Sequence, residues 1–280
     1  LHGSPCMDSD PILEYLCGLP HDHYRPVVVC GAGVNGLAYA RSLGRRKVPG
    51  VLLDATPQPG LASRYGVGGL TADPQLAASE VLDLLGRIAT SCREPPVLVA
   101  TADRYLAFFG KHQDRLAGEY LLVAPDKHTL ATVLDKKQQY QRAASAGIPL
   151  PGTWFPGSRD ELENALSAAN FPCIVKPYAA HEGRRLLGGR KVAVAESAAH
   201  LEGIFEGLGY GAQFMVQEQI PGGDDRLLGY LGLWDEGAEK IWFTKRKKRQ
   251  SPPRFGDGSA QFGEWNDDIH ELSRRPNHLN

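Results

Sequence analysis

One lysine stands in an otherwise apolar stretch, where a positive charge needs a partner. Lys176 is the only charged residue of the segment PCIVKP, residues 172–177, which has the pattern of a buried strand. Burial of an ammonium group costs several kcal/mol unless an anion compensates its charge. The position therefore favours a bound anion, although a lysine that extends from a strand edge into solvent is the alternative.

The loop that follows this strand, residues 178–192, is rich in glycine and in positive charge. Its flexible backbone amides and its basic side chains are suited to cover a polyphosphate, whereas the alternative is a solvated basic hairpin loop. The glycines and basic residues of the loop are Gly183, Arg184, Arg185, Gly188, Gly189, Arg190 and Lys191.

A third segment, MVQEQIPGGDD at residues 215–225, joins an apolar strand to a Pro-Gly-Gly turn. The strand backbone could bind the edge of an adenine ring, and Asp224 or Asp225 could bind the ribose hydroxyls. A plain β-turn with two acidic residues is the alternative.

Near the start of the chain, VVVCGAGVNGL at residues 27–37 has the spacing G-x-G-x-x-G. Gly31 permits a tight turn, Gly33 lets the backbone approach a pyrophosphate, and Gly36 lets helix and strand pack closely. Asp54 follows the next apolar run and could bind a ribose. The pattern leaves an NAD(P)-dependent oxidoreductase open as one interpretation.

Apolar strands alternate with helix-length segments, which predicts an α/β chain with a doubly wound parallel sheet in its first part. The expected strands cover residues 27–30, 51–53, 97–100, 173–177, 191–195, 214–220, 228–234 and 240–247, and the expected helices cover 35–43, 74–91, 126–147, 159–169 and 198–208.

Taken in order, these motifs resemble the ATP-grasp superfamily, and in particular carboxylate-amine ligases related to D-aspartate ligase. The likeness runs from about residue 25 to residue 260. The matching segments are the Asp135-Lys136 pair, GIPLP at 147–151, IVKP at 174–177, the glycine-rich loop, QEQIPG at 217–222 and KKRQSPP at 247–253. The resemblance implies a Rossmann-like domain followed by an ATP-grasp α+β domain that is truncated at its C-terminal end.

The resemblance also implies roles for single residues. Lys136 and Lys176 would contact the phosphates of ATP, and the loop 182–191, with Gly188, Gly189 and Lys191, would close over them. Gln217, Glu218 and the backbone through Ile220 would hold adenine, and Asp224 would hold the ribose. Lys247 and Arg249 would face the γ-phosphate and the carboxylate to be activated, as catalytic residues. Such ligases form an acyl phosphate from ATP and a carboxylate, and an amine then displaces phosphate.

In such proteins the N-terminal unit usually helps to shape the substrate site and does not bind a dinucleotide. The glycines of residues 27–37 are therefore expected to serve the turn and the approach of the substrate. Residues 63–66 and Asp103 could line that site, although Asp103 could instead cap a helix. The implied partners are a small-molecule carboxylate and an amine, which could be amino acids.

Magnesium is the other implied cofactor, and its ligands are not identified in the sequence. Glu264-Trp265-Asn266 has the form E-x-N that such ligases use, but no strand with a first carboxylate precedes it. The expected organisation is a leader at 1–24, a Rossmann-like domain at 25–125, a partial ATP-grasp domain at 126–262 and a polar tail at 263–280. A nucleotide-binding protein without catalysis remains the alternative.

Bulk composition narrows the class of protein. Of the 280 residues, 42% are hydrophobic and 22% are charged, with a formal net charge of −1, so nothing indicates nucleic acid as a partner. The five cysteines are scattered and form no C-x-x-C pair, which argues against disulfides and structural zinc and favours a cytoplasmic location. No apolar run is long enough to span a membrane. The oligomeric state is not predicted.

Overall fold

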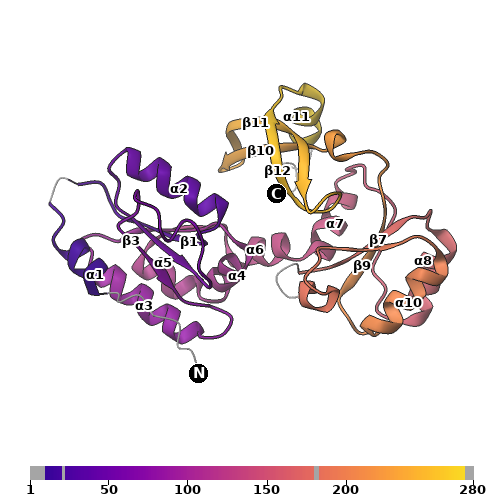
Figure 1. Ribbon diagram of the computed structural model, residues 1–280, viewed down its shortest axis with the longest axis horizontal. Helices are drawn as coiled ribbons and strands as arrows, with labels where there is room; N and C mark the ends of the chain where they lie inside the picture. The colour runs from indigo at the N-terminus through magenta and orange to yellow at the C-terminus, as the bar shows by residue number, and fades with distance from the viewer. Residues whose placement is uncertain (1–9, 21–22, 180–182, 275–280) are drawn as a thin grey trace. The chain divides into compact units, whose positions relative to one another are not determined.

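The computed structural model describes residues 10–20, 23–179 and 183–274 of the chain (Figure 1). Parts of the expected leader and tail, and residue 182 of the expected loop, lie outside these residues. The chain divides into two compact units, residues 1–134 and 135–280. The sequence placed this boundary nine residues earlier, after residue 125.

The first unit contains a parallel sheet of five strands in the order β3-β2-β1-β4-β5, as the doubly wound pattern predicts. Val28 of β1 pairs with Val51 of β2 on one side and with Leu98 of β4 on the other. The strands are β1 (Val27–Cys30), β2 (Gly50–Asp54), β3 (Gly68–Thr71), β4 (Val97–Ala100) and β5 (Leu121–Val123).

Helices cover both faces of this sheet because alternate residues of its strands point to opposite sides (Figure 1). Val28 of β1 packs with the helices α1, α3 and α4, whereas its neighbour Val29 packs on the side of α2. The helices of the unit are α1 (Asp10–Cys17), α2 (Val34–Arg45), α3 (Ala78–Thr90), α4 (Asp103–Lys111), α5 (Gln113–Glu119) and α6 (Lys127–Leu134).

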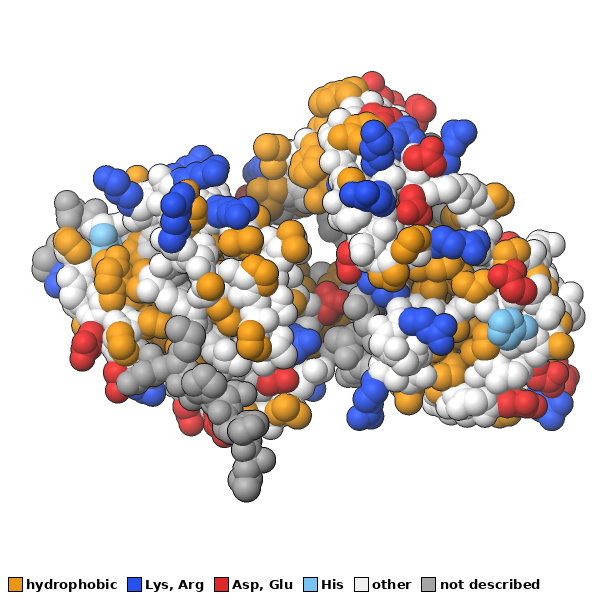
Figure 2. Space-filling view, in the orientation of Figure 1, with side chains coloured by type: hydrophobic (Ala, Val, Ile, Leu, Met, Phe, Trp, Pro, Cys, Tyr) orange, Lys and Arg blue, Asp and Glu red, His pale blue; other side chains and the backbone are white. Residues whose placement is uncertain are grey.

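The charge of the first unit is unevenly distributed. Arg41 and Arg45 lie on α2, and Arg46 and Lys47 follow it. Figure 2 shows Lys and Arg side chains gathered over this helix. The net charge of −1 therefore averages over a surface that is locally basic.

The second unit begins where the sequence predicted the middle of one long helix, at residues 126–147, and this prediction is wrong. Asp135 has an extended backbone, and its carboxylate accepts hydrogen bonds from the amides of Lys137 and Gln138. It therefore caps a new helix, α7 (Lys136–Ser145), and ends the run of α6.

An antiparallel sheet in the order β6-β9-β7-β8 follows α7. Cys173 and Val175 of β7 and Val216 of β9 pack against the helices on one face. The elements are β6 (Thr153–Trp154), α8 (Arg159–Ala168), β7 (Cys173–Pro177), the 3₁₀ helix η1 (Arg184–Leu187), β8 (Ala193–Ala195), α10 (Ala198–Leu208) and β9 (Phe214–Glu218).

A second antiparallel sheet, in the order β10-β11-β12, completes the described part of the unit. Residues 264–274 were expected in an exposed polar tail, but most of them form a helix that packs on β10 and β11. The elements are the 3₁₀ helix η2 (Asp224–Arg226), β10 (Leu228–Asp235), β11 (Ala238–Ser251), β12 (Asp257–Gly263) and α11 (Asp267–Arg274).

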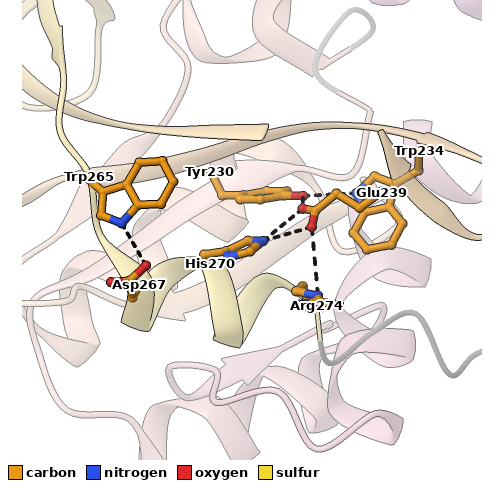
Figure 3. Close-up of polar contacts among 7 residues, drawn as sticks. All are labelled: Tyr230, Trp234, Glu239, Trp265, Asp267, His270 and Arg274. Atoms are coloured by element: carbon orange, nitrogen blue, oxygen red, sulfur yellow. Dashed lines mark hydrogen bonds and ion pairs between the residues drawn. The ribbon is translucent and has the colours of Figure 1, made fainter. Parts of the chain in front are cut away.

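A carboxylate anchors α11 to this sheet (Figure 3). Glu239 accepts a hydrogen bond from the Tyr230 hydroxyl, lies 2.9 Å from His270 Nε2 and forms an ion pair with Arg274. The His270 ring also stacks on Trp242, with ring centroids 3.6 Å apart. Burial opposes ionisation of Glu239, but the hydrogen bonds and the positive charges around it leave its pKa below the ordinary value. Polar residues that were expected in an exposed tail thus hold α11 on this sheet.

No helix among the described residues is both long enough and apolar enough to cross a membrane.

Candidate functional site

The sheet β6-β9-β7-β8 has one apolar face and one polar face. Cys173 and Val175 point toward α8 and α10, so Ile174 and Lys176 point to the other side. Gln217 of β9 pairs with Ile174 and shares this polar face. The pleat of two neighbouring strands therefore brings Lys176 and Gln217 together.

Lys176 is held by neutral groups on this face. Its Nζ donates a hydrogen bond to Gln217 Oε1 at 2.7 Å and another to the Tyr140 hydroxyl at 3.1 Å, and it lies 5.1 Å from the centroid of the Tyr140 ring. Gln217 is buried and donates in turn to Thr153 Oγ1 at 2.9 Å. Lys176 forms no ion pair with a carboxylate of the described residues. Among the described residues, its charge is therefore positioned without a carboxylate partner.

Lys136 approaches the same region from α7. Its backbone amide donates to the carbonyl of Tyr178 at 3.0 Å, and its Nζ lies 3.4 Å from the same oxygen. Tyr178 directly follows β7. The cap at Asp135 fixes the start of α7, and so it fixes where Lys136 leaves the helix.

Tyr140 lies between these two charges. Burial raises the pKa of its hydroxyl, but the positive charge of Lys176, hydrogen bonds with Gln217 and Lys176, and the charge of Lys136 together leave the pKa below its ordinary value. The structure thus gathers Lys136, Tyr140, Lys176 and Gln217, two of which the resemblance assigned to phosphate and one to adenine.

A second polar cluster joins η2 to β11. Asp224 accepts hydrogen bonds from the backbone amide of Gln250 at 3.1 Å and from its Nε2 at 2.9 Å. Gln250 is buried; its Nε2 also donates to the carbonyl of Arg254, and its Oε1 accepts from Lys247 Nζ at 3.3 Å. The structure therefore brings together Asp224 and Lys247, which the sequence assigned to ribose and to catalysis, with Gln250 between them.

The other expected adenine residues are Glu218 and Ile220, and neither forms a hydrogen bond with Lys176 in the described part of the chain. Glu218 lies on the opposite face of β9, where its carboxylate accepts from the backbone amide of Asn170 at 2.9 Å and from its side chain at 2.8 Å. These bonds lower the pKa of Glu218. Ile220 lies beyond the end of β9 and is 69% exposed.

Lys191, at the end of the glycine-rich loop, forms an ion pair with Asp257 at the start of β12. Gly188 and Gly189 both have positive φ, at 62° and 82°, with open space where a Cβ would stand. Left-handed backbone of this kind favours glycine. Arg249 lies exposed on β11.

The described residues contain no group of three His, Cys, Asp or Glu side chains that could hold a metal ion. In the E-x-N segment, Glu264 forms an ion pair with Arg246, which keeps the pKa of Glu264 low. Asn266 Oδ1 accepts from the amide of Ile269 at 2.9 Å and caps α11. Within the described part of the chain, Glu264 and Asn266 are thus engaged in contacts of the fold and do not form a magnesium site.

In the first unit, hydrogen bonds and close packing within the protein occupy the glycine turn that begins at Gly31. Asp54, the residue that could bind an NAD ribose, is buried, and its carboxylate accepts from the amides of Ala32 at 2.6 Å and Ala55 at 2.7 Å. Gly31 has a φ of 105°, and a Cβ on Gly36 would lie 2.0 Å from the Gly31 carbonyl oxygen. Turn geometry and helix packing account for these residues.

The alternative that Asp103 caps a helix is wrong. Ala102 occupies the cap position of α4, and Asp103 stands in its first turn, where an acidic side chain is favoured by the helix dipole. At the other expected substrate segment, Ser63 Oγ accepts from the amide of Tyr65.

Sequence reasoning missed Tyr140, Thr153 and Gln250. Tyr140 follows Lys136 by four residues on one helix, so the two side chains share a face. That spacing could have identified Tyr140. Gln250 gave no such signal, because its position depends on how η2 meets β11.

No family model matches the sequence, and no curated protein matches it. Solved structures do match. The ADP complex of an N5-carboxyaminoimidazole ribonucleotide synthetase superposes with a TM-score of 0.66 at 12% identity, over 91% of this chain and 63% of that one. The synthetase of this name from Thermus thermophilus gives 0.64 at 15% identity, over 90% and 64%.

A third structure is the biotin carboxylase domain of a Hydrogenobacter thermophilus 2-oxoglutarate carboxylase, with MgADP, ADP and bicarbonate. It gives a TM-score of 0.63 at 13% identity, over 91% of this chain and 58% of that one. The chain has an ATP-grasp fold. The chain spans 58 to 64% of the length of these three structures, which is less than two thirds of each.

Proposed function

We propose that this chain binds ATP on the polar face of the sheet β6-β9-β7-β8, as part of a ligase that joins a carboxylate to an amine. One observation carries the proposal. Lys176, on an apolar strand, is held by Gln217 and Tyr140, and no carboxylate of the described residues pairs with it. A positive charge positioned in this way favours a phosphate group. The ATP-grasp fold and the nucleotides bound in similar structures support ATP as the ligand.

The chemistry follows from what ATP supplies, a transferable γ-phosphoryl group. A carboxylate oxygen of the substrate would take that group, giving an acyl phosphate and ADP. The amine nitrogen would then attack the acyl carbon, phosphate would leave, and an amide would form. Phosphoryl transfer demands mainly positioning and positive charge around the oxygens, which Lys136, Lys176 and, from β11, Lys247 and Arg249 would provide.

We propose a small-molecule carboxylate and amine as the substrates, amino acids among them. Similar structures are complexes with aminoimidazole ribonucleotide in one protein and with bicarbonate in another. These molecules show how far substrates vary on one fold, because the substrate contacts come from loops. Magnesium would accompany ATP as its complex in solution, and no protein ligand is assigned to it.

Calorimetric titration with ATP, ADP and NAD tests the binding proposal. We expect saturable binding of ATP to the wild type and an affinity loss of about tenfold or more in Lys176→Met, because a hydrogen bond to a charged group contributes about 1.5–3 kcal/mol. Lys240→Met is the matched control, since Lys240 lies on the β10–β11 hairpin and pairs with Asp235. Binding of NAD alone, or equal affinity of the wild type and Lys176→Met for ATP, contradicts the proposal.

The ligase part is tested separately, by ADP release with pairs of amino acids as carboxylate and amine donors. We expect release that depends on both donors and that is lost in Lys176→Met. Saturable ATP binding without any donor-dependent release contradicts the ligase part and favours a nucleotide-binding protein without catalysis.

A further inference from the structure

Of the two described residues that accept a hydrogen bond from Lys176 Nζ, Tyr140 is the one that can ionise. Its hydroxyl lies 3.1 Å from Lys176 Nζ and 3.3 Å from Gln217 Oε1. The other partners in this network, Gln217 from β9 and Thr153 from β6, are neutral at every pH. Charged groups reach the hydroxyl from β7, as Lys176, and from its own helix, as Lys136.

The donors of Lys176 limit what this site can do. An ammonium group has three N–H donors. Gln217 Oε1 and the Tyr140 hydroxyl each take one, and this leaves one donor for a ligand. The two partners fix the direction of the third N–H, so Tyr140 helps to aim the charge of Lys176.

We propose that Tyr140 is a positioning residue for Lys176, and that its ionisation at alkaline pH neutralises the lysine and weakens phosphate binding. The inference rests on the proposed function, because it assumes that Lys176 binds the phosphates of ATP. A neutral phenol accepts a hydrogen bond from the lysine and leaves its full charge for the ligand. A tyrosinate forms an ion pair with the same lysine and competes with phosphate for it.

The direction of the Tyr140 pKa, below its ordinary value, supports this inference. It means that ionisation begins at lower pH than in an exposed tyrosine. Lys176 itself is present in the variants with and without the Tyr140 hydroxyl. A comparison with phenylalanine therefore isolates the effect of the tyrosine.

The first experiment measures ATP affinity between about pH 7 and pH 10 in the wild type, Tyr140→Phe and the control Tyr39→Phe on α2. Phenylalanine keeps the ring that lies near Lys176 and removes only the oxygen. At neutral pH we expect Tyr140→Phe to bind ATP roughly threefold to tenfold more weakly, because the hydroxyl acts on ATP only through the direction of the Lys176 side chain. As the pH rises we expect the wild type and Tyr39→Phe to lose affinity first, while Tyr140→Phe changes less.

The second experiment observes the tyrosine directly and does not require ATP. The ring carbon that bears the hydroxyl is labelled with ¹³C in all tyrosines, and the resonance missing from Tyr140→Phe is assigned to Tyr140. We expect this resonance to titrate at lower pH than that of a free tyrosine, and to titrate at higher pH in Lys176→Met because the stabilising charge is lost.

The outcomes separate the two proposals. If Lys176→Met weakens ATP binding but Tyr140→Phe has the affinity and the pH profile of the wild type, the proposed function stands and this inference is overturned. An unchanged Tyr140 titration in Lys176→Met also overturns it. If the wild type binds no ATP at any pH, the proposed function and this inference fail together.

Discussion

Asp224→Asn discriminates between two roles of one carboxylate. The resemblance assigns Asp224 to the ribose of ATP, whereas in the structure its two oxygens accept from the backbone amide and the side chain of Gln250. Asparagine has nearly the same shape but keeps one acceptor oxygen, and its NH₂ group would face a donor of Gln250. The substitution therefore removes one hydrogen bond to a charged group and leaves a donor of a buried glutamine without a partner.

The size of the effect can be worked from these contacts. A hydrogen bond to a charged group contributes about 1.5–3 kcal/mol, and since Asp224 is only half-buried the lower end applies, about 1.5 kcal/mol. A loss of 1 kcal/mol lowers the melting temperature of a unit of this size by about 2–4 °C. We therefore expect Asp224→Asn to lower the melting temperature of the second unit by about 3–6 °C. We expect its ATP affinity to fall by much less than tenfold.

Tryptophan fluorescence reports this transition, because Trp154, Trp234, Trp242 and Trp265 all lie in the second unit. Thermal melts and ATP titrations are run on the same samples of wild type, Asp224→Asn and Asp225→Asn. The last is the matched control, since its side chain is exposed and it loses the same charge. A tenfold loss of ATP affinity in Asp224→Asn, with the melting temperature of the control, would refute the structural role and support the ribose role.

Three further predictions concern stability. Gly36→Ala places a methyl group 2.0 Å from the Gly31 carbonyl oxygen, so we expect it to lower the free energy of unfolding by about 3 kcal/mol or to prevent folding of the first unit. In the control Gly33→Ala, the added methyl group has no neighbour within 3.7 Å. We therefore expect little change in its circular dichroism melt. Glu239→Gln should lower the melting temperature at pH 7 but not near pH 3. The reason is that the stabilisation from a lowered carboxyl pKa is present at neutral pH and is lost as the pH falls through that pKa. A difference in melting temperature that persists near pH 3 contradicts the reasoning. Asp135→Ala should cost about 1 kcal/mol in thermal melts and also weaken ATP binding through the lysine that follows it.

Elements with a local signal could be predicted from the sequence. The expected helix at 198–208 has the bounds of α10, because Ser197 precedes it and its hydroxyl accepts from the amide of His200. Ser158 caps α8 in the same way. The strands β1 and β4 also have the expected bounds, since both are short apolar runs in the middle of the sheet.

Elements that depend on neighbours could not be predicted. β3 begins with Gly68-Gly69, which have no side chains to mark a strand, and it is a strand because it pairs with β2 at the sheet edge. β12 alternates small and polar residues and is fixed by its pairing with β11. For both strands the backbone hydrogen bonds come from a partner far away in the sequence, so no local window contains the information.

The lysines of the candidate site could be predicted from the sequence, but the arrangement of the side chains around them could not. Motif spacing points to Lys136 and Lys176, and the structure places both beside Tyr140. The same motif treats Gln217 and Glu218 as one adenine-binding pair. Consecutive residues of a strand point to opposite faces, so Gln217 contacts Lys176 while Glu218 contacts Asn170. The pleat of β9 therefore gives the two side chains separate tasks: the amide contacts Lys176, and the carboxylate holds the connection between α8 and β7.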